Sequence, residues 1–262
     1  GAQCSADFDS PGRLTELVLQ LSPDVVVNAA AYTAVDQAES DAEAAFRINA
    51  EAPAALARAC AARDALLLQY STDYVFDGCS TQPYREDAVT APLGVYGASK
   101  LAGEQAIRDS GARHAILRTA WVYAAHGKNF LLTMLRLAAG HDALRVVADQ
   151  IGAPTSAAWI ADASTQLLQQ GVQSSNTWHL VCAGQTSWHG FAQAIVHEAH
   201  ALGLLQRLPQ VIPISTSDYP TPAQRPAYSV LDTAKLQHDF SIAPPDWQHA
   251  LRTTLRVLAS TR

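Results

Sequence analysis

Short apolar runs alternate with longer amphipathic stretches along most of the chain. Within the runs, polar and apolar residues do not alternate, which is typical of strands covered on both faces of a parallel sheet. The clearest runs are Asp24 to Ala30 and Ala65 to Ser71. Further strands are predicted at 115–119, 144–148, 178–182 and 211–214.

Helical patterns separate these strands. Helices are predicted at 11–20, 41–63, 96–111, 129–139, 157–170, 187–202 and 246–258. Pro53 is expected either to kink the second of them or to start a new helix there, and Gly203 is a stop signal after the sixth. Strands that alternate with helices predict an α/β fold built on a parallel, doubly wound sheet.

Polar residues follow three of the predicted strands directly. Asn28 ends one strand, Ser71-Thr72-Asp73 follow the next, and Thr119 ends a third. Parallel α/β sheets bind their ligands beyond the carboxyl ends of the strands. We therefore expect the chemistry of this protein at one rim of the sheet.

Tyr96 and Lys100 stand four residues apart on a predicted helix, so their side chains share one face, about 6 Å apart along the axis. An ammonium favours the phenolate, and we expect it to lower the pKa of Tyr96. This pair suits protonation of a carbonyl oxygen while a hydride reaches the carbon. The same spacing occurs by chance on ordinary amphipathic helices, and the neighbouring strand that ends in hydroxyls favours the catalytic interpretation.

The composition is that of a globular chain with a sizeable core. It has 262 residues, 48% hydrophobic and 16% charged, enough for one large α/β domain or two small ones. The net charge of −6 and the lack of a Lys/Arg run argue against nucleic acid and anionic membranes as partners. No apolar stretch approaches the length of a membrane-spanning helix.

Neither the cysteines nor the histidines form a recognisable metal motif. Cys4, Cys60, Cys79 and Cys182 are scattered, which favours small, buried, unpaired residues in a reducing, cytoplasmic setting over disulfides. His197 and His200 are three residues apart rather than four, so we expect a solvated helix face rather than a zinc site. The first residues lack the regions of a signal peptide.

Six stretches together resemble the extended short-chain dehydrogenase/reductases and, within them, the dTDP-4-dehydrorhamnose reductase family. The stretches typical of the superfamily are 23–36, 70–76 and 96–104; those more specific to the family are 118–123, 149–155 and 219–226. The resemblance implies a Rossmann-like doubly wound sheet with a smaller C-terminal substrate-binding region.

The resemblance also implies a division of the chain. Residues 1–118 would form the cofactor-binding domain, with 140–174 returning to it, and 119–139 and 175–262 would mainly bind substrate. No Gly-x-x-Gly-x-x-Gly is present, although a dinucleotide site needs this loop. We expect it, with its two flanking strands, in roughly 30 residues before Gly1. The residue that selects NAD or NADP would lie there, so the cofactor is NADPH or NADH.

By resemblance, the reaction is reduction of the 4-keto group of dTDP-6-deoxy-L-lyxo-4-hexulose to dTDP-L-rhamnose, for cell-surface polysaccharide biosynthesis. Tyr96 would protonate the keto oxygen, which Thr72 would hold. Lys100 would lower the pKa of Tyr96 and bind the nicotinamide ribose. Proton transfer of this kind supplies about 10²–10⁴ in rate.

The resemblance assigns further residues to the two ligands. The cofactor would contact Asp7 and Phe8, which are expected to follow the end of a strand and to hold the adenine, together with Ala29, Ala30, Ala31, Thr33, Tyr96 and Lys100. The dTDP-sugar would contact Thr72, Asp73, Trp121, Asn129, Gln150 and Arg225. Simpler explanations stay open: tight packing for the alanines, core filling for Trp121 and a surface charge for Arg225.

Other activities of related proteins remain as alternatives. Tyr74 stands where sugar-nucleotide dehydratases carry a glutamate, which argues against a dehydratase. A nucleotide-sugar epimerase, and a non-catalytic regulatory subunit similar to that of methionine adenosyltransferase, are kept. Ala157 and Ala158 stand where some family members have a metal-bridging glutamate, so we expect no metal site and no metal-bridged dimer. A homodimer is left open.

Overall fold

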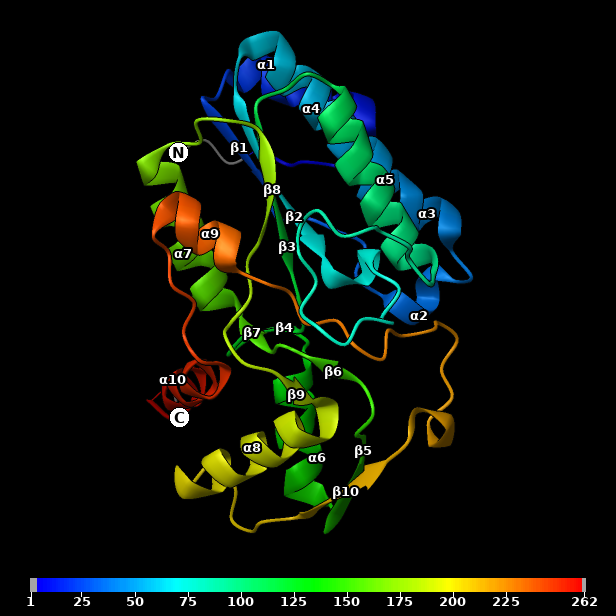
Figure 1. Ribbon diagram of the computed structural model, residues 1–262, viewed down its shortest axis with the longest axis vertical. Helices are drawn as coiled ribbons and strands as arrows, with labels where there is room; N and C mark the ends of the chain where they lie inside the picture. The colour runs from blue at the N-terminus through cyan, green and yellow to red at the C-terminus, as the bar shows by residue number, and fades with distance from the viewer. Residues whose placement is uncertain (1–3, 261–262) are drawn as a thin grey trace.

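The computed structural model describes residues 4–260 and is built around a four-stranded parallel sheet of order β1-β2-β3-β8 (Figure 1). The strands are β1 (Val25–Asn28), β2 (Leu66–Thr72), β3 (His114–Thr119) and β8 (Asn176–His179). In the register, Asn28 lies opposite Gln69, and Thr72 opposite Thr119. The carboxyl ends of these strands therefore meet at one rim, as predicted.

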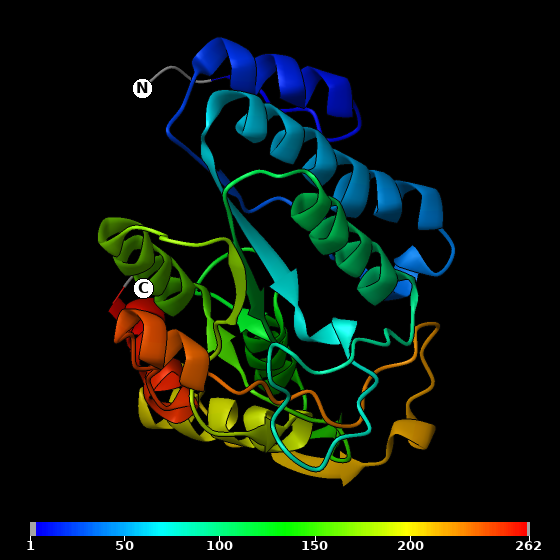
Figure 2. The ribbon, with the colours of Figure 1, turned by 45° about the horizontal axis from the view of Figure 1, so that its top comes forward.

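Helices cover both faces of this sheet (Figure 2). One face carries α4 (Ala52–Arg63) and α5 (Val95–Asp109), with α1 (Pro11–Leu21) on α4; the other carries α7 (Ala157–Gln170) and α9 (Ala234–Phe240). Successive residues of β2 point to opposite faces, so Leu67 packs with the first layer while Leu66 and Leu68 pack with the second. The predicted doubly wound sheet is confirmed.

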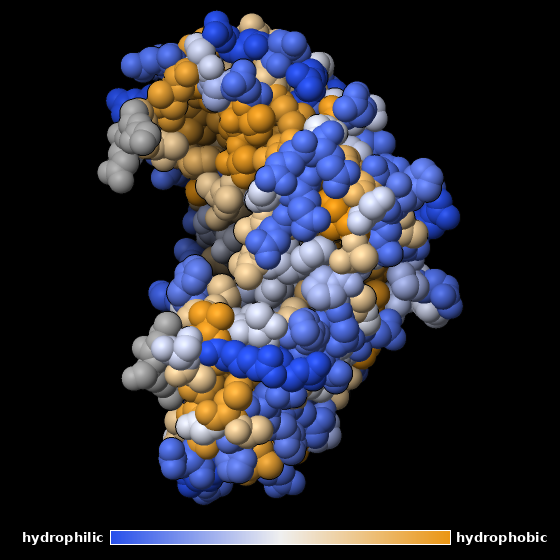
Figure 3. All heavy atoms as spheres, turned by 90° about the vertical axis from the view of Figure 1, so that its left-hand side faces the viewer, coloured by the Kyte–Doolittle hydropathy of each residue, from blue (hydrophilic) through white to orange (hydrophobic). Residues whose placement is uncertain are grey.

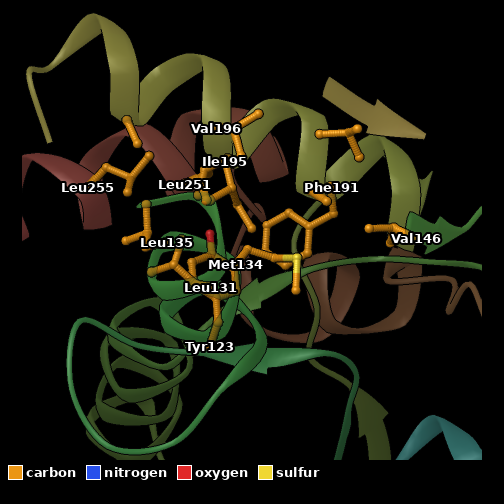
Figure 4. Packing of buried hydrophobic residues seen from close by; sticks show 14 of the residues in the cluster. Tyr123, Leu131, Met134, Leu135, Val146, Phe191, Ile195, Val196, Leu251 and Leu255 are labelled. Atoms are coloured by element: carbon orange, nitrogen blue, oxygen red, sulfur yellow. The ribbon is translucent and has the colours of Figure 1, made fainter. Parts of the chain in front are cut away.

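A smaller lobe lies beyond the carboxyl rim (Figure 1). Its helices are α6 (Phe130–Gly140), α8 (Trp188–Ala201) and α10 (Trp247–Ser260). Its strands are short and lie in pairs: β5 (Ala143–Val147) with β10 (Gln210–Ile214), β4 (Val122–Tyr123) with β7 (Thr155–Ser156), and β6 (Ile151–Gly152) with β9 (Thr186–Ser187). Its core packs Leu131, Phe191 and Leu251 from the three helices (Figure 4). This packing makes the lobe a compact unit with a core of its own, next to the carboxyl rim of the sheet.

Two segments lie on the other side of the division expected from the sequence. β8 belongs to the main sheet and α9 packs against it, although both fall within 175–262. β5 belongs to the smaller lobe, because it pairs with β10, although it falls within 140–174. The chain therefore crosses between the two parts more often than expected. The sequence did not predict these crossings, because long-range strand pairing does not change the local composition.

The prediction that β1 is covered on both faces is wrong for this chain. Val25 and Val27 are 40% and 47% exposed, because β1 pairs only with β2 in the described residues and one of its faces is open. Leu19 and Leu21 of α1 are exposed nearby, and Figure 3 shows apolar side chains gathered over this end of the molecule. The glycine loop expected before Gly1 stays a prediction.

The stretch 41–63 is divided by a new helix start at Pro53, one of the two outcomes expected there, and not by a kink. α3 (Ala42–Phe46) passes into a π-helix, η1 (Arg47–Glu51), and α4 follows. Pro53 lies in the first turn of α4, where a missing N–H is harmless. The π-helix turns Asn49 inward, where its side chain bonds both the N–H and the carbonyl of Tyr32.

Several short elements were not predicted, namely α2 (Val35–Ala38), η2 (Asp73–Val75), η3 (Thr216–Asp218) and α9. Conversely, the strand expected to reach Cys182 ends at His179. All four cysteines are free, as expected, and Cys60 and Cys182 are buried, but Cys4 and Cys79 are exposed, contrary to expectation. His197 and His200 are exposed on α8, as expected. Among the described helices, none combines the length and the apolar character needed to cross a bilayer.

Candidate active site

Thr72 is fixed at the carboxyl end of β2. Its Oγ1 accepts the backbone N–H of Tyr74 at 3.1 Å, which caps the short helix η2. The same hydroxyl donates to Oδ1 of Asp73 at 3.0 Å. Thr72 is 5% exposed, so a buried hydroxyl of defined orientation stands at the centre of the rim.

Tyr96 reaches this hydroxyl because the first turn of α5 packs directly on the backbone of η2. A Cβ on Gly97 would lie 2.2 Å from the carbonyl oxygen of Tyr74, so only glycine allows the approach. The rings of Tyr74 and Tyr96 meet edge to face, with centroids 5.7 Å apart. Tyr96 and Thr72, from different elements, are therefore brought together as predicted.

The expected effect of Lys100 on Tyr96 is wrong for this structure. Burial raises the pKa of Tyr96 to about 12, opposed by a hydrogen bond with Thr72 and reinforced by the nearby carboxyl of Asp73. Nζ of Lys100 instead donates to the carbonyl of Tyr70 at 2.7 Å. Tyr96 is consequently a neutral phenol at physiological pH, which is the form that donates a proton.

Lys100 is a buried charge without a directly bonded carboxylate. Its side chain forms no ion pair with the described residues, and it is 4% exposed. Burial lowers its pKa to about 8, and the field of Glu104 limits the shift. A buried, strongly perturbed lysine at the rim of an α/β sheet is a candidate for a ligand contact.

Asp73 is the second isolated charge of the site. It is buried beside Thr72, and burial raises its pKa to about 6 against the effect of its hydrogen bonds. Its bond with Thr72 orients the hydroxyl whose oxygen faces Tyr96. The structure thus places three predicted residues, Thr72, Tyr96 and Asp73, in one cluster, with Lys100 one turn farther along α5.

The small residues expected to line the cofactor channel follow β1. Buried Asn28 anchors this turn: its amide donates to Gln69 at 2.8 Å, and its Oδ1 accepts the N–H of Ala30 at 3.1 Å. Ala29, Ala30, Ala31 and Thr33 are exposed or partly exposed at the rim. Small exposed side chains allow the close approach that a dinucleotide requires, so this segment fits a nicotinamide cofactor.

Asp7 and Phe8 do not follow a strand in the described residues, contrary to expectation. The carboxylate of Asp7 accepts hydrogen bonds from Ser10 and Asp9 just before α1, and Phe8 packs on the α1–α4 layer. Asp9 pairs with Arg47 of the π-helix at 3.1 Å. This segment therefore contacts the same π-helix that holds Tyr32 through Asn49.

A cavity of about 440 Å³ opens in the smaller lobe and contains two of the predicted substrate ligands, Gln150 and Arg225. Phe130, Trp188 and Tyr219 add aromatic surface. Gln150 donates to Thr216 at 3.0 Å. The cavity thus combines flat apolar walls with an amide and a guanidinium, which suits a nucleotide.

Trp121 and Asn129 support this cavity from behind. Trp121, with a positive φ of 47°, stacks on Trp188 at 3.5 Å between ring centroids. The side chain of Asn129 accepts the N–H of Leu132 as the N-cap of α6 and donates to the carbonyls of Ala124 and His126. These bonds occupy the Asn129 amide, and its contact with substrate stays a prediction.

Sequence reasoning missed several residues at the two sites. Trp188, Phe130 and Tyr219 line the cavity, and Tyr74 packs on Tyr96. Only Tyr74 and Tyr219 lay in stretches that had drawn attention, whereas an aromatic residue at a helix start carries no signal of its own. Arg225 was also incompletely understood, because its guanidinium is already paired with Asp36 at 2.8 Å.

Comparison with known proteins gives this arrangement a family. Residues 2–260 match the model of the RmlD substrate binding domain, which spans almost the whole chain. The chain belongs to the RmlD family. A dTDP-4-dehydrorhamnose reductase of Burkholderia thailandensis is 48% identical over 268 residues, covering 99% of this chain and 90% of the relative. The reductase of Salmonella typhimurium is 43% identical over 258 residues, covering 97% and 86%.

Solved structures agree with this membership of the RmlD family. A dTDP-4-dehydrorhamnose reductase from Clostridium acetobutylicum superposes with a TM-score of 0.90 and 35% identity, over 96% of this chain and 87% of that one. The reductase from Bacillus anthracis, solved in complex with NADP, also superposes with a TM-score of 0.90. It is 34% identical, and the match covers 96% of this chain and 86% of that one. The Rossmann-like fold expected from the sequence is confirmed.

Proposed function

We propose that this protein reduces the 4-keto group of dTDP-6-deoxy-L-lyxo-4-hexulose to give dTDP-L-rhamnose, with NADPH or NADH. The observation that carries the proposal is the convergence of Thr72 and Tyr96 at the carboxyl rim, with buried Lys100 one turn away, in a chain of the RmlD family. Relatives at 48% and 43% identity are named for this reaction.

The nicotinamide cofactor supplies the hydride. Lys100 would bind its ribose hydroxyls, and Ala29 to Ala31 with Thr33 would line its channel; Asp7 and Phe8 are proposed for its adenine end. A buried ammonium that bonds only a carbonyl has two N–H groups left for such hydroxyls. The NADP bound to the Bacillus anthracis reductase supports this class of cofactor.

Tyr96 acts as the proton donor. Its raised pKa keeps the phenol protonated until negative charge develops on the keto oxygen, when the transfer becomes favourable. Thr72 holds that oxygen by donating a hydrogen bond, for which its proton must turn away from Asp73. Thr72 is buried and Tyr96 is largely desolvated, which strengthens each of these interactions.

The nucleotide part of the substrate would occupy the cavity of the smaller lobe. Arg225 would bind the diphosphate, and Gln150 with the aromatic walls would contact the base; all of them line this cavity. Trp121 supports the wall formed by Trp188. Action on a diffusible dTDP-sugar in the cytoplasm, as part of dTDP-rhamnose biosynthesis, belongs to this proposal.

The decisive experiment follows the absorbance of NADPH and NADH on addition of the dTDP-keto-sugar. Wild type should oxidise the cofactor, and Tyr96→Phe should lose roughly 10²–10⁴ in kcat because the proton donor is gone. Tyr228→Phe is the matched control, since within residues 4–260 its hydroxyl donates to Gln185 and forms no hydrogen bond with Thr72 or Tyr96. A folded wild type that binds cofactor but oxidises none would refute the proposal.

A further inference from the structure

The short helix α2 touches the segment that carries Arg225. This segment, residues 219–226, is here called the strap, and it brings Tyr219, Thr221 and Arg225 to the wall of the cavity. Both carboxylate oxygens of Asp36 accept from Arg225, at 3.0 Å and 2.8 Å. Oδ1 also accepts the N–H of Ala223 at 3.2 Å. Three hydrogen bonds therefore fasten the strap to α2 across 189 positions of sequence.

Asp36 also sets the orientation of the guanidinium. Nη1 of Arg225 donates to Asp36, to the hydroxyl of Thr221 and to the carbonyl of Ala223. With the bidentate pair to Asp36 in place, the Arg225 side chain is 21% exposed. Without the carboxylate, both the strap and the long arginine side chain would regain rotational freedom.

One residue beyond α2, Glu39 holds the start of the catalytic helix. Its Oε1 accepts the N–H of Val95 at 2.9 Å. The N-cap of α5 is Gly94, which has no side chain to satisfy this exposed helix end, and a Cβ there would lie 2.6 Å from Glu39 Oε1. Tyr96 follows Val95 in the first turn, the part of a helix that frays most readily.

We propose that Asp36 and Glu39 are positioning residues that tie the strap and the first turn of α5 to one short helix, so that the held nucleotide and the Tyr96 hydroxyl keep a defined separation. The inference rests on the proposed function. Neither carboxylate needs to touch the substrate: Asp36 acts through Arg225, and Glu39 acts through the backbone of Val95. The short helix α2 and its C-cap residue Glu39 then serve both the binding and the chemical step.

Substitutions of Asp36 and Glu39 should affect different steady-state parameters. Asp36→Asn should raise KM for the dTDP-sugar about tenfold with little change in kcat, because it loosens only the binding strap. Glu39→Gln should lower kcat about threefold with little change in KM, because it weakens the charged cap beneath Tyr96. The Kd of NADPH, followed by its fluorescence, should stay unchanged in both variants.

A double-mutant cycle tests whether Asp36 acts through Arg225. If it does, Asp36→Asn should have far less effect in an Arg225→Lys background than in wild type. Glu43→Gln is the matched control, because Glu43 is an exposed carboxylate whose ion pair in the described part of the chain is with Arg47. Circular dichroism and thermal unfolding establish that each variant is folded before its kinetics are compared.

Binding of dTDP by calorimetry distinguishes this inference from the proposed function. If wild type binds dTDP but has no turnover with the keto-sugar, the proposed function and the role of Glu39 fall, while Asp36→Asn should still weaken dTDP about tenfold. Equal dTDP affinity in Asp36→Asn and wild type, additive effects in the cycle, or no dTDP binding by wild type would overturn the role of Asp36. A Glu39→Gln variant with unchanged kcat would overturn the role of Glu39.

Discussion

Helix α5 contains two buried charges, four residues apart, that are treated in opposite ways. The carboxylate of Glu104 accepts hydrogen bonds from Nε and Nη2 of Arg118, at 2.9 Å and 2.7 Å, and from Nη2 of Arg108 at 2.6 Å. Lys100 donates to one backbone carbonyl. Both side chains are almost fully buried, at 0% and 4% exposure, so burial alone does not distinguish them.

The pKa directions show which charge the fold supports. Burial pushes the pKa of Glu104 upward, but the two arginines outweigh it and the pKa ends below its usual value, so the carboxylate is favoured. For Lys100, burial dominates and lowers the pKa to about 8. Glu104 is a structural charge, whereas Lys100 is kept at some expense of stability, as expected for a group that waits for a ligand.

The partnered end also anchors the helix to the sheet. Arg118 belongs to β3, and its guanidinium lies over the ring of Phe76 at 5.1 Å. The ion pair thus joins α5 to β3, while the opposite end of α5 presents Tyr96 to Thr72. The part of α5 around Glu104 is thus anchored to the sheet, and it supports the part that carries Tyr96 and the unpaired charge of Lys100.

Removing the structural charge should have the largest effect on stability. Glu104→Gln leaves Arg118 buried without an anion, and we expect the free energy of unfolding to fall by about 3–5 kcal/mol in a urea titration at pH 7. Glu16→Gln, at an exposed position on α1, should stay within about 0.5 kcal/mol of wild type. A loss below about 1 kcal/mol for Glu104→Gln would contradict the comparison.

Removing the charge of Lys100 should change the free energy of unfolding in the opposite direction. Lys100→Met should abolish activity yet raise the free energy of unfolding at pH 7 by about 1–2 kcal/mol, because an apolar chain replaces a buried ammonium. The carbonyl of Tyr70 is not orphaned, since Gln69 donates to it at 2.8 Å. Urea titrations of both proteins across pH measure the difference.

The pH dependence of this difference has a defined direction. The folded pKa of about 8 lies below the usual 10.5, so between these values the unfolded chain binds more protons and wild type gains stability as pH rises. The advantage of Lys100→Met should therefore be complete below pH 8 and disappear towards pH 10.5. A variant less stable than wild type at pH 7 would show that Lys100 is a structural charge after all.

The sequence was sufficient where local pattern and function coincide. The apolar run of β2 with Thr72 at its end, and the spacing of Tyr96 and Lys100, predicted the sheet and the rim correctly. The sequence could not show that burial would outweigh the ammonium at Tyr96, because that balance depends on what covers the ring.

Long-range pairing set the other limit. Nothing local distinguishes Asp36 as the partner of Arg225, or β8 as the neighbour of β3, since each pair is joined only in the folded chain. The exposure of Val25 and Val27 likewise depends on which strands neighbour β1. These features required tertiary structure, whereas the fold class and the meeting of Thr72 with Tyr96 at the rim did not.

The smallest expected effect concerns Asp73, the uncompensated acid of the site. Its folded pKa of about 6 lies above the usual 3.8, so in this window the folded chain binds more protons and wild type loses stability as pH rises. Asp73→Asn keeps an acceptor for Thr72 without the charge, and should be more stable than wild type by about 1 kcal/mol at pH 7, with no difference near pH 4.

Urea titrations at pH 4, 5, 6 and 7 measure this trend, with Asp87→Asn as the exposed control that should follow wild type. The comparison with Lys100 then becomes sharper. The acid is most costly above about pH 6 and the base below about pH 8, so both penalties are present together only between these values. A flat difference for Asp73→Asn across this range would mean that its carboxylate has a structural partner, as Glu104 does.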